Sequence, residues 1–396
     1  MLFNLSVIIV IALLLSKGFE KMRLPGLLGM ILTGVLLGSQ GFDYICPSVL
    51  NISSELRTAA LIVILIRAGL GISKSTLHKI GVSAFKMSFI PCLFEGTFLI
   101  IITMLLLDFT FIQAGMLAFV LSAVSPAVIV PQMLELKELG FGQNKEVPTL
   151  VLAGSSIDDV FAITLFGAFV SMNQPNSDHS ILSQLMNIPL GIFSGLLIGC
   201  ALGFILVYFF KKFNIRDTKK IMVFMIVAIG FHHFEELKLM PVASLLGIMT
   251  IGFVILERSE SVAKRLAARF NKIWVLAEIL LFTMIGAAVK LDAISGNFVV
   301  LLSIIIIGLV GRSLGVWAAL FGSNLNNKEK TFCTIAYLPK ATVQAAIGGV
   351  PLALGLPHGQ EILAIAVLAI IFTAPLGAIG VRLSSEKLLE KSSCID

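Results

Sequence analysis

The chain has 396 residues, of which 57% are apolar and only 13% are charged, whereas about 25% of the residues in soluble domains carry a charge. This composition excludes a soluble protein and predicts a polytopic membrane protein without an appended soluble domain. The net charge of +6 is explained by basic loops that contact lipid headgroups, so it does not indicate a nucleic-acid partner. The five cysteines lack disulfide or metal spacing, and the sequence contains no P-loop or other sign of a cofactor.

Hydropathy predicts an all-α fold with about thirteen transmembrane helices, because about 20 apolar residues cross the hydrocarbon core and flanking residues allow somewhat fewer. The predicted helices are 2–16, 24–39, 56–71, 79–106, 112–134, 146–170, 185–210, 219–234, 241–256, 271–290, 296–321, 329–351 and 359–383. Residues within two positions of a predicted helix end are counted with the adjoining connector. Of the 29 Lys and Arg residues, 22 then lie in the C-terminal tail or in connectors after odd-numbered helices, and three lie in connectors after even-numbered helices. Since basic residues accumulate on the cytoplasmic side, we expect an outside N-terminus and a cytoplasmic C-terminus, in the inner or plasma membrane.

Several charged residues lie well inside the predicted helices, where each costs about 2.5 to 3.5 kcal/mol. They are Arg67, Lys86, Arg312, Lys340, Glu95, Asp158, Asp159 and Glu278. Arg67 and Lys86 lie near cytoplasmic helix ends and are predicted to extend toward the interface, with a role in the site as the alternative. Glu278 is either part of a gate or a satisfied interior carboxylate. The remaining five are central, so we expect them to pair or to line an ion pathway.

Two predicted helices carry prolines in their middle. The fifth contains Pro126 and Pro131, and the twelfth contains Pro339. Because proline removes a backbone donor and disfavours helical geometry just before it, we expect both helices to be interrupted near mid-membrane. A separation of seven helices reverses the orientation of the second one, so the pattern also predicts an inverted repeat of residues 59–170 and 274–383.

Asp158 and Asp159 are adjacent on the sixth helix, so their side chains diverge by about 100°. One can take a fixed counter-charge while the other faces a cavity. A carboxylate in such a cavity binds either a proton or a hard monovalent cation, and this mutual exclusion is the basis of an exchange mechanism. Cation affinity should then rise with pH until the carboxylates are ionised. The alternative is that both carboxylates are structural.

Other polar residues near the interruptions are candidates for supporting roles. Ser125 and Ser155 offer oxygen ligands, as do carbonyls freed at the first interruption. Lys340 is predicted to compensate unpaired carbonyl ends and to pair with an aspartate when the cation is absent. Glu95 and Arg312 are predicted to pair as a structural brace, because a bidentate arginine pair is rigid; direct participation in ion exchange is the alternative.

The segments VSPAVIVPQML, VPTLVLAGSSIDDVFAIT and LPKATVQAAIG, together with RAGLG, resemble the monovalent cation:proton antiporter superfamily, in particular the sodium/hydrogen antiporters of the NHA type. The resemblance covers roughly residues 20–380. It implies the NhaA-type fold, with two crossed discontinuous helices, an ion-transport core that moves like an elevator, and a dimerisation domain. A homodimer is therefore expected.

The same resemblance implies residue roles. Asp159 would be the principal ion-binding acid, with Asp158 as its partner in holding Na+, and Lys340 would lie between the crossed helices. Arg312 stands where electrogenic relatives carry a lysine, which favours one-for-one electroneutral exchange. Exchange of two protons per sodium, with Lys340 as the second carrier, stays open.

Residues 1–396 are thus predicted to form one integral membrane unit. The ion-transport core is expected in parts of 56–170 and 271–383, and scaffold or dimerisation helices are expected at 1–39 and 185–256. Glycines spaced four apart occur twice in these scaffold ranges, at positions 191 to 203 and at 34 and 38. They are predicted to serve helix packing, with a dimer contact as the alternative.

The predicted function is secondary antiport of Na+, or Li+, against H+. Alternatives within transporters are a K+/H+ exchanger and an organic-anion:sodium symporter; adjacent carboxylates disfavour an anionic substrate. An intramembrane aspartyl protease would place its two carboxylates on separate helices around one scissile bond. An ion channel would carry rings of charge or filter loops, which the sequence lacks.

Overall fold

A computed structural model of the chain describes residues 2–22, 24–71, 74–172, 181–213, 215–236, 242–290 and 298–391. Within these ranges the secondary structure is helical, and pairing between extended segments is limited to one isolated bridge, Phe141 to Lys391. The helices are α1 (Leu2–Lys21), α2 (Leu27–Leu37), α3 (Pro47–Leu50), α4 (Ser53–Gly71), α5 (Lys74–Leu106), α6 (Phe111–Leu121), α7 (Pro126–Glu138), the 3-10 turn η1 (Gln143–Lys145), α8 (Val147–Met172), α9 (Ile181–Lys212), α10 (Asp217–Glu236), α11 (Ser244–Arg258), α12 (Glu260–Ala288), α14 (Phe298–Ala319), α15 (Asn327–Ala336), α16 (Thr342–Ile347), α17 (Val350–Ala353) and α18 (Gly359–Leu388).

Each predicted transmembrane range falls on one helix or on an interrupted series of helices. Within the described ranges, seven helices are long and apolar enough to cross a membrane: α1, α5, α8, α9, α12, α14 and α18. Shorter apolar helices occur at Leu27–Leu37, Phe111–Leu121 and Thr342–Ala353. A multi-pass, all-helical membrane fold is therefore confirmed, while the count of thirteen spans stays a prediction.

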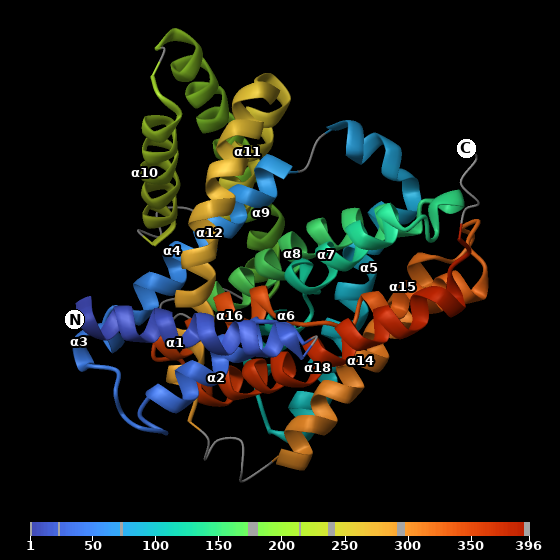
Figure 1. Cartoon of the computed structure of the whole chain (residues 1–396), viewed down its shortest axis with the longest axis horizontal. Helices are drawn as coiled ribbons and strands as arrows, with labels where there is room; N and C mark the ends of the chain where they lie inside the picture. Colours follow the sequence, from blue (N-terminus) through green and yellow to red (C-terminus); the bar gives the residue numbers. More distant parts are fainter. Residues whose placement is uncertain are drawn as a thin grey trace. The chain divides into compact units, whose positions relative to one another are not determined.

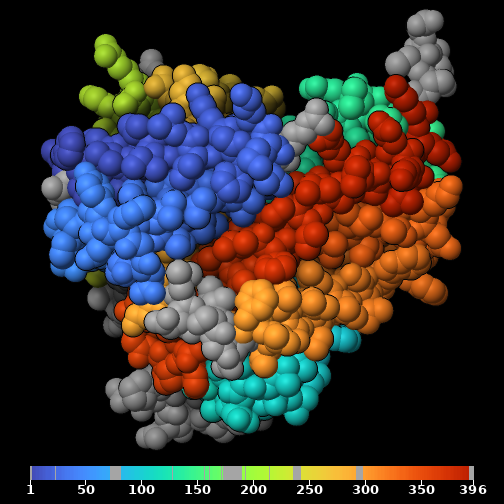
Figure 2. All heavy atoms as spheres, turned by 60° about the horizontal axis from the view of Figure 1, so that its bottom comes forward, coloured from blue at the N-terminus to red at the C-terminus, as the bar shows by residue number. Residues whose placement is uncertain are grey.

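The chain divides into two compact units, which we describe separately. The first comprises Met1–Ser54, Ile80–Phe169 and Phe282–Asp396, and the second comprises Glu55–Lys79 and Val170–Leu281. In the first unit, α18 packs against α6, α7, α14, α15, α16 and α17. Figures 1 and 2 show α18, in red, beside α14 and α15, in orange. The expected division into transport core and dimerisation helices stays a prediction.

Two short helices of the first unit begin at side-chain caps. The Thr110 hydroxyl accepts from the Gln113 backbone N–H, and the Gln113 side chain accepts from the Thr110 N–H, which starts α6. Asn326 and Glu329 form the same reciprocal pair at the start of α15. Such capping boxes satisfy backbone donors that a helix leaves free at its N-terminus. Both helices end where an interruption begins, α6 at Leu121 and α15 at Ala336, and the candidate site lies at these interruptions.

The glycines spaced four apart serve helix packing within each unit. Side chains at Gly199 and Gly203 of α9 would collide with Gly247 and Val254 of α11. In the first unit, a side chain at Gly34 of α2 would collide with the Thr283 carbonyl near the end of α12. Small residues let helix backbones approach this closely. The packing role predicted for these glycines is therefore confirmed.

Candidate functional site

Both proline-bearing helices are interrupted in the first unit. The helical hydrogen bonding stops at α6 and resumes at α7, leaving residues 122–125 non-helical, and it stops at α15 and resumes at α16, leaving residues 337–341 non-helical. Pro126 is the first residue of α7, and Pro339 lies inside the second interruption. The two interruptions touch, because the Ser125 backbone N–H donates to the Pro339 carbonyl at 2.8 Å.

Two side chains donate hydrogen bonds to the backbone carbonyls that the interruptions leave free. The Gln344 amide donates to the carbonyls of Val120, Leu121 and Ala123 at 3.1, 3.3 and 2.9 Å. Arg312 donates from Nε to the Tyr337 carbonyl at 2.9 Å and from Nη1 to the Ser122 carbonyl. The sequence predicts that Lys340 compensates these carbonyls, whereas the hydrogen bonds come from Gln344 and Arg312. Planar amide and guanidinium groups present several N–H donors in fixed directions, which suits a cluster of carbonyls better than one ammonium does.

Four buried ionisable residues form what we call the charge cluster: Glu95 of α5, Asp158 of α8, Arg312 of α14 and Lys340. Arg312 Nη1 lies 3.0 Å from Glu95 Oε2, and Nη2 lies 2.7 Å from Asp158 Oδ2. Lys340 Nζ lies 2.6 Å from Glu95 Oε2, so this lysine pairs with the glutamate and not with an aspartate. All four are at most 2% exposed. Two acids and two bases cancel in formal charge.

The adjacent aspartates differ in their partners. Asp158 Oδ2 accepts from Arg312 and from the Val124 backbone N–H at 2.8 Å. Asp159 is partly buried, and its Oδ1 is a buried atom that makes no hydrogen bond within the described part of the chain. Asp158 Oδ1 is also without a hydrogen bond. The structure thus fixes one carboxylate by an arginine and leaves a polar atom of the other without a partner.

The two candidate serines are buried near these groups. Ser125 Oγ lies 3.4 Å from Thr342 Oγ1 and accepts from the Thr342 backbone N–H at 3.4 Å. Ser155 lies one turn before Asp159 and donates to the Leu152 carbonyl of its own helix at 3.1 Å. Three further polar residues of the site were not predicted: Gln344, Thr342 and Thr373. The Thr373 hydroxyl accepts from the Lys340 backbone N–H at 2.8 Å. Their position indicates them in the sequence, because each is a polar residue within five positions of a proline in an otherwise apolar segment.

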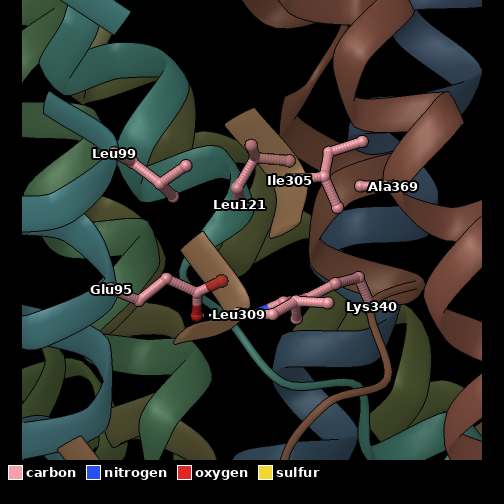
Figure 3. Close-up of a pocket in the computed structure, with 7 residues that line it drawn as sticks. All are labelled: Glu95, Leu99, Leu121, Ile305, Leu309, Lys340 and Ala369. Atoms are coloured by element: carbon pink, nitrogen blue, oxygen red, sulfur yellow. Dashed lines mark hydrogen bonds and ion pairs between the residues drawn. The ribbon is translucent and has the colours of Figure 1, made fainter. Parts of the chain in front are cut away.

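A small cavity borders the charge cluster on the side of Glu95 and Lys340. Its other lining residues are apolar: Leu99, Leu121, Ile305, Leu309 and Ala369. Figure 3 shows the Glu95 carboxylate and the Lys340 ammonium facing each other, with the leucines and Ile305 around them. The cavity volume is about 10 Å³, which is about the room one water molecule needs. Asp159 does not line it.

Three other charged residues were predicted inside helices: Arg67, Lys86 and Glu278. In the second unit, Arg67 Nε donates to Asn271 Oδ1 at 2.7 Å, and its guanidinium lies 5.2 Å from the centre of the Trp274 ring. Glu278 interacts electrostatically with Arg67. Arg67 therefore contacts side chains of α12. The predicted extension toward the interface did not include these contacts. Lys86, in the first unit, is partly buried.

Buried ionisable groups around two interrupted apolar helices are the architecture of an ion-coupled secondary transporter. A family model described as "Sodium/hydrogen exchanger, transmembrane" matches residues 6–384. The chain is 32% identical over 425 residues to sodium/hydrogen exchanger 9B1 of Homo sapiens, covering 98% of this chain and 78% of that protein. It is 34% identical over 421 residues to sodium/hydrogen exchanger 9B2 of Xenopus tropicalis, covering 99% and 75%. The chain therefore belongs to the transmembrane sodium/hydrogen exchanger family.

The fold agrees with this assignment. It is similar to a solved structure of the sodium proton antiporter MjNhaP1 from Methanocaldococcus jannaschii, with a TM-score of 0.83, 18% sequence identity and 98% coverage of both chains. The resemblance to the monovalent cation:proton antiporter superfamily is confirmed. Sodium/hydrogen exchangers are transporters, so this chain is a multi-pass membrane transporter and not an enzyme.

Proposed function

We propose that this chain exchanges Na+ for H+ by competition at Asp159. The observation that carries the proposal is the contrast between the acids of the site. Glu95 and Asp158 pair with arginine or lysine at 2.6 to 3.0 Å. Within the described residues Asp159 forms no such ion pair, and its buried Oδ1 makes no hydrogen bond. A carboxylate without a fixed counter-charge must bind a proton or a cation to stay buried.

The exchange cycle follows from that requirement. Ionised Asp159 binds Na+, with the second oxygen coming from Asp158 Oδ1, which is also without a hydrogen bond. Protonated Asp159 has lost the negative charge and releases the cation. Proton and cation therefore exclude each other, so Na+ affinity rises with pH until Asp159 is ionised and then levels off.

The charge balance favours one-for-one exchange. The charge cluster is neutral when its two acids and two bases are ionised, and Arg312 does not deprotonate in proteins. The net charge of the site then changes only with Asp159, which takes up one Na+ or one H+. Each half of the cycle therefore moves the same charge.

The architecture supports the NhaA-type arrangement as part of this proposal. The two interrupted helices, joined by the hydrogen bond from Ser125 to Pro339, would be the crossed pair at the centre of an inverted repeat. The similarity to the MjNhaP1 fold supports the same arrangement. We further propose an elevator motion of the core, a homodimer, thirteen spans with the N-terminus outside, a place in the cell membrane, and Li+ as a second substrate.

Reconstitution into proteoliposomes tests the proposal. An imposed Na+ gradient should drive H+ movement in the wild-type chain, and Asp159→Asn should abolish it, because an amide binds neither a proton nor Na+ strongly. The same assay with Li+ and K+ measures selectivity, and K+ as the preferred ion would favour the K+/H+ alternative.

A matched control is Asp108→Asn, which changes an exposed acid at a positive φ of 52° that asparagine tolerates. It should exchange at the wild-type rate. Near-normal exchange by Asp159→Asn, in protein with an unchanged melting temperature, would remove Asp159 from the mechanism.

A further inference from the structure

Tyr337 is a buried polar residue that the exchange cycle above does not use. It caps the C-terminal end of α15, at the second interruption, and it is 0% exposed. Its hydroxyl makes no hydrogen bond within the described part of the chain. A buried hydroxyl without a partner is less favourable than the phenylalanine ring that would fill the same space. We therefore expect the hydroxyl to gain a partner that binds during function.

Contacts with Arg312 fix the position of Tyr337. The Tyr337 carbonyl accepts from Arg312 Nε at 2.9 Å, and the guanidinium carbon lies 5.2 Å from the centre of the tyrosine ring. Arg312 in turn holds Asp158 at 2.7 Å. The tyrosine ring is thus coupled to Asp158 through one side chain, and its orientation is not free.

The hydroxyl points at α8 on the face that carries Asp158. A Cβ added at Gly154 would collide with Tyr337 Oη, so the hydroxyl occupies the space that the glycine leaves open. Gly154 precedes Asp158 by four residues, which places the two on one face of the helix, one turn apart. Tyr337 also interacts electrostatically with both Asp158 and Asp159.

Three buried oxygens that make no hydrogen bond within the described residues therefore lie on α8 or against it: Asp158 Oδ1, Asp159 Oδ1 and Tyr337 Oη. Two are carboxylate oxygens that only accept, and the third is a hydroxyl that both donates and accepts. A hard monovalent cation takes several oxygen ligands, and neutral ones add coordination without adding charge. A phenol hydroxyl at this place suits a cation that the carboxylates hold.

We propose that the Tyr337 hydroxyl belongs to the cation site and binds the Na+ held by Asp159, directly or through one ordered water. This inference rests on the proposed function, and it adds a residue that sets cation affinity and selectivity. Because the hydroxyl is neutral, it leaves the one-for-one charge balance unchanged. Gly154 serves the same site by making room for the hydroxyl beside α8.

Tyr337→Phe tests the proposal, since it removes the hydroxyl alone and keeps the ring and the carbonyl that contact Arg312. In proteoliposomes we expect the apparent KM for Na+ to rise about ten-fold, in the range for losing a hydrogen bond to a charged group, with the maximal rate within two-fold of wild type. The stabilisation by Na+ in a thermal melt should shrink correspondingly. The melting temperature without Na+ should not fall.

The control is Tyr208→Phe, which removes the hydroxyl of an exposed tyrosine on α9 and should leave every readout unchanged. An unchanged KM and an unchanged Na+-dependent thermal shift in Tyr337→Phe would overturn the inference, as would a lower melting temperature with normal KM, which is a purely structural effect. Failure of the proposed function looks different: the wild-type chain would show no Na+-driven H+ movement. The thermal shift with NaCl would then still report whether Tyr337 binds Na+.

Discussion

Arg312 organises the candidate site at the scale of single residues. Its guanidinium donates to two carboxylates, of Glu95 and Asp158, and to two carbonyls, of Ser122 and Tyr337. A lysine has one compact ammonium and does not present donors in a planar fork, so it would not join these four acceptors. The arginine therefore links the first interruption, the second interruption, α5 and α8 in one rigid contact.

Loss of the Glu95 carboxylate should lower the stability of the protein. Its Oε2 contacts both Arg312 and Lys340. Glu95→Gln leaves two buried cations with one carboxylate between them, and breaking a buried pair costs about 3 to 5 kcal/mol. We expect a clearly lower melting temperature in detergent, with the preference between Na+ and Li+ unchanged.

Glu260→Gln is the matched control, because it removes an exposed carboxylate 2.7 Å from Lys264, and surface pairs contribute little. Its melting temperature should stay at the wild-type value. A melt of Glu95→Gln that matches this control would count against the bracing role, and altered ion preference would assign Glu95 to the exchange step.

At the scale of elements, the two interruptions depend on side chains that replace lost helical hydrogen bonds. Each broken helix leaves carbonyls that must be satisfied, because the hydrocarbon core offers no water. Gln344, in the first turn of α16, bonds three of them across the interruption of the other helix. Its Oε1 also accepts from the Ala341 N–H at 2.8 Å, so it caps its own helix. One amide thus stabilises both interruptions.

Gln344→Leu should therefore destabilise the protein. Leucine is of similar size, but it leaves buried carbonyls without donors, at about 1 to 3 kcal/mol for each unsatisfied group. We expect a lower melting temperature and a lower yield of folded protein. Gln360→Leu is the comparison, since that amide makes one 3.4 Å bond to the Ala288 carbonyl; equal effects of the two substitutions would contradict the role of Gln344.

At the scale of the whole molecule, the charged residues fall into two groups, those in the connectors and those in the charge cluster. Most of the 29 Lys and Arg residues lie in connectors predicted on one side of the membrane, where they set orientation. Arg312 and Lys340 lie in the charge cluster, where Glu95 and Asp158 cancel them. The net charge of +6 therefore describes the surface, and the proposed transport site carries only the charge of Asp159.

This balance predicts a transport rate that does not depend on voltage. One Na+ against one H+ moves no net charge, whereas two H+ per Na+ would move one charge, which is worth about 2.3 kcal/mol per 100 mV. In vesicles clamped at 0 and at 100 mV, we expect Na+-driven H+ fluxes that agree within two-fold. A strong response to voltage would show that a second group, with Lys340 as the first candidate, carries a proton.

Local sequence features were enough to predict much of this protein. Apolar segment lengths predicted the helical membrane fold, and prolines at 126 and 339 predicted both interruptions. The adjacent Asp158 and Asp159 predicted that one carboxylate could take a fixed counter-charge, and Asp158 pairs with Arg312. Hydropathy, proline geometry and helical spacing act over a few residues, so they can be read along the chain.

The tertiary structure decided the pairings: Arg312 with Asp158 as well as Glu95, Lys340 with Glu95, and Gln344 with the broken helix. These partners are 154 to 245 residues apart, and only packing determines which donor reaches which acceptor. The position of the Tyr337 hydroxyl in the gap at Gly154 belongs to the same class, because nothing along the chain connects the two residues.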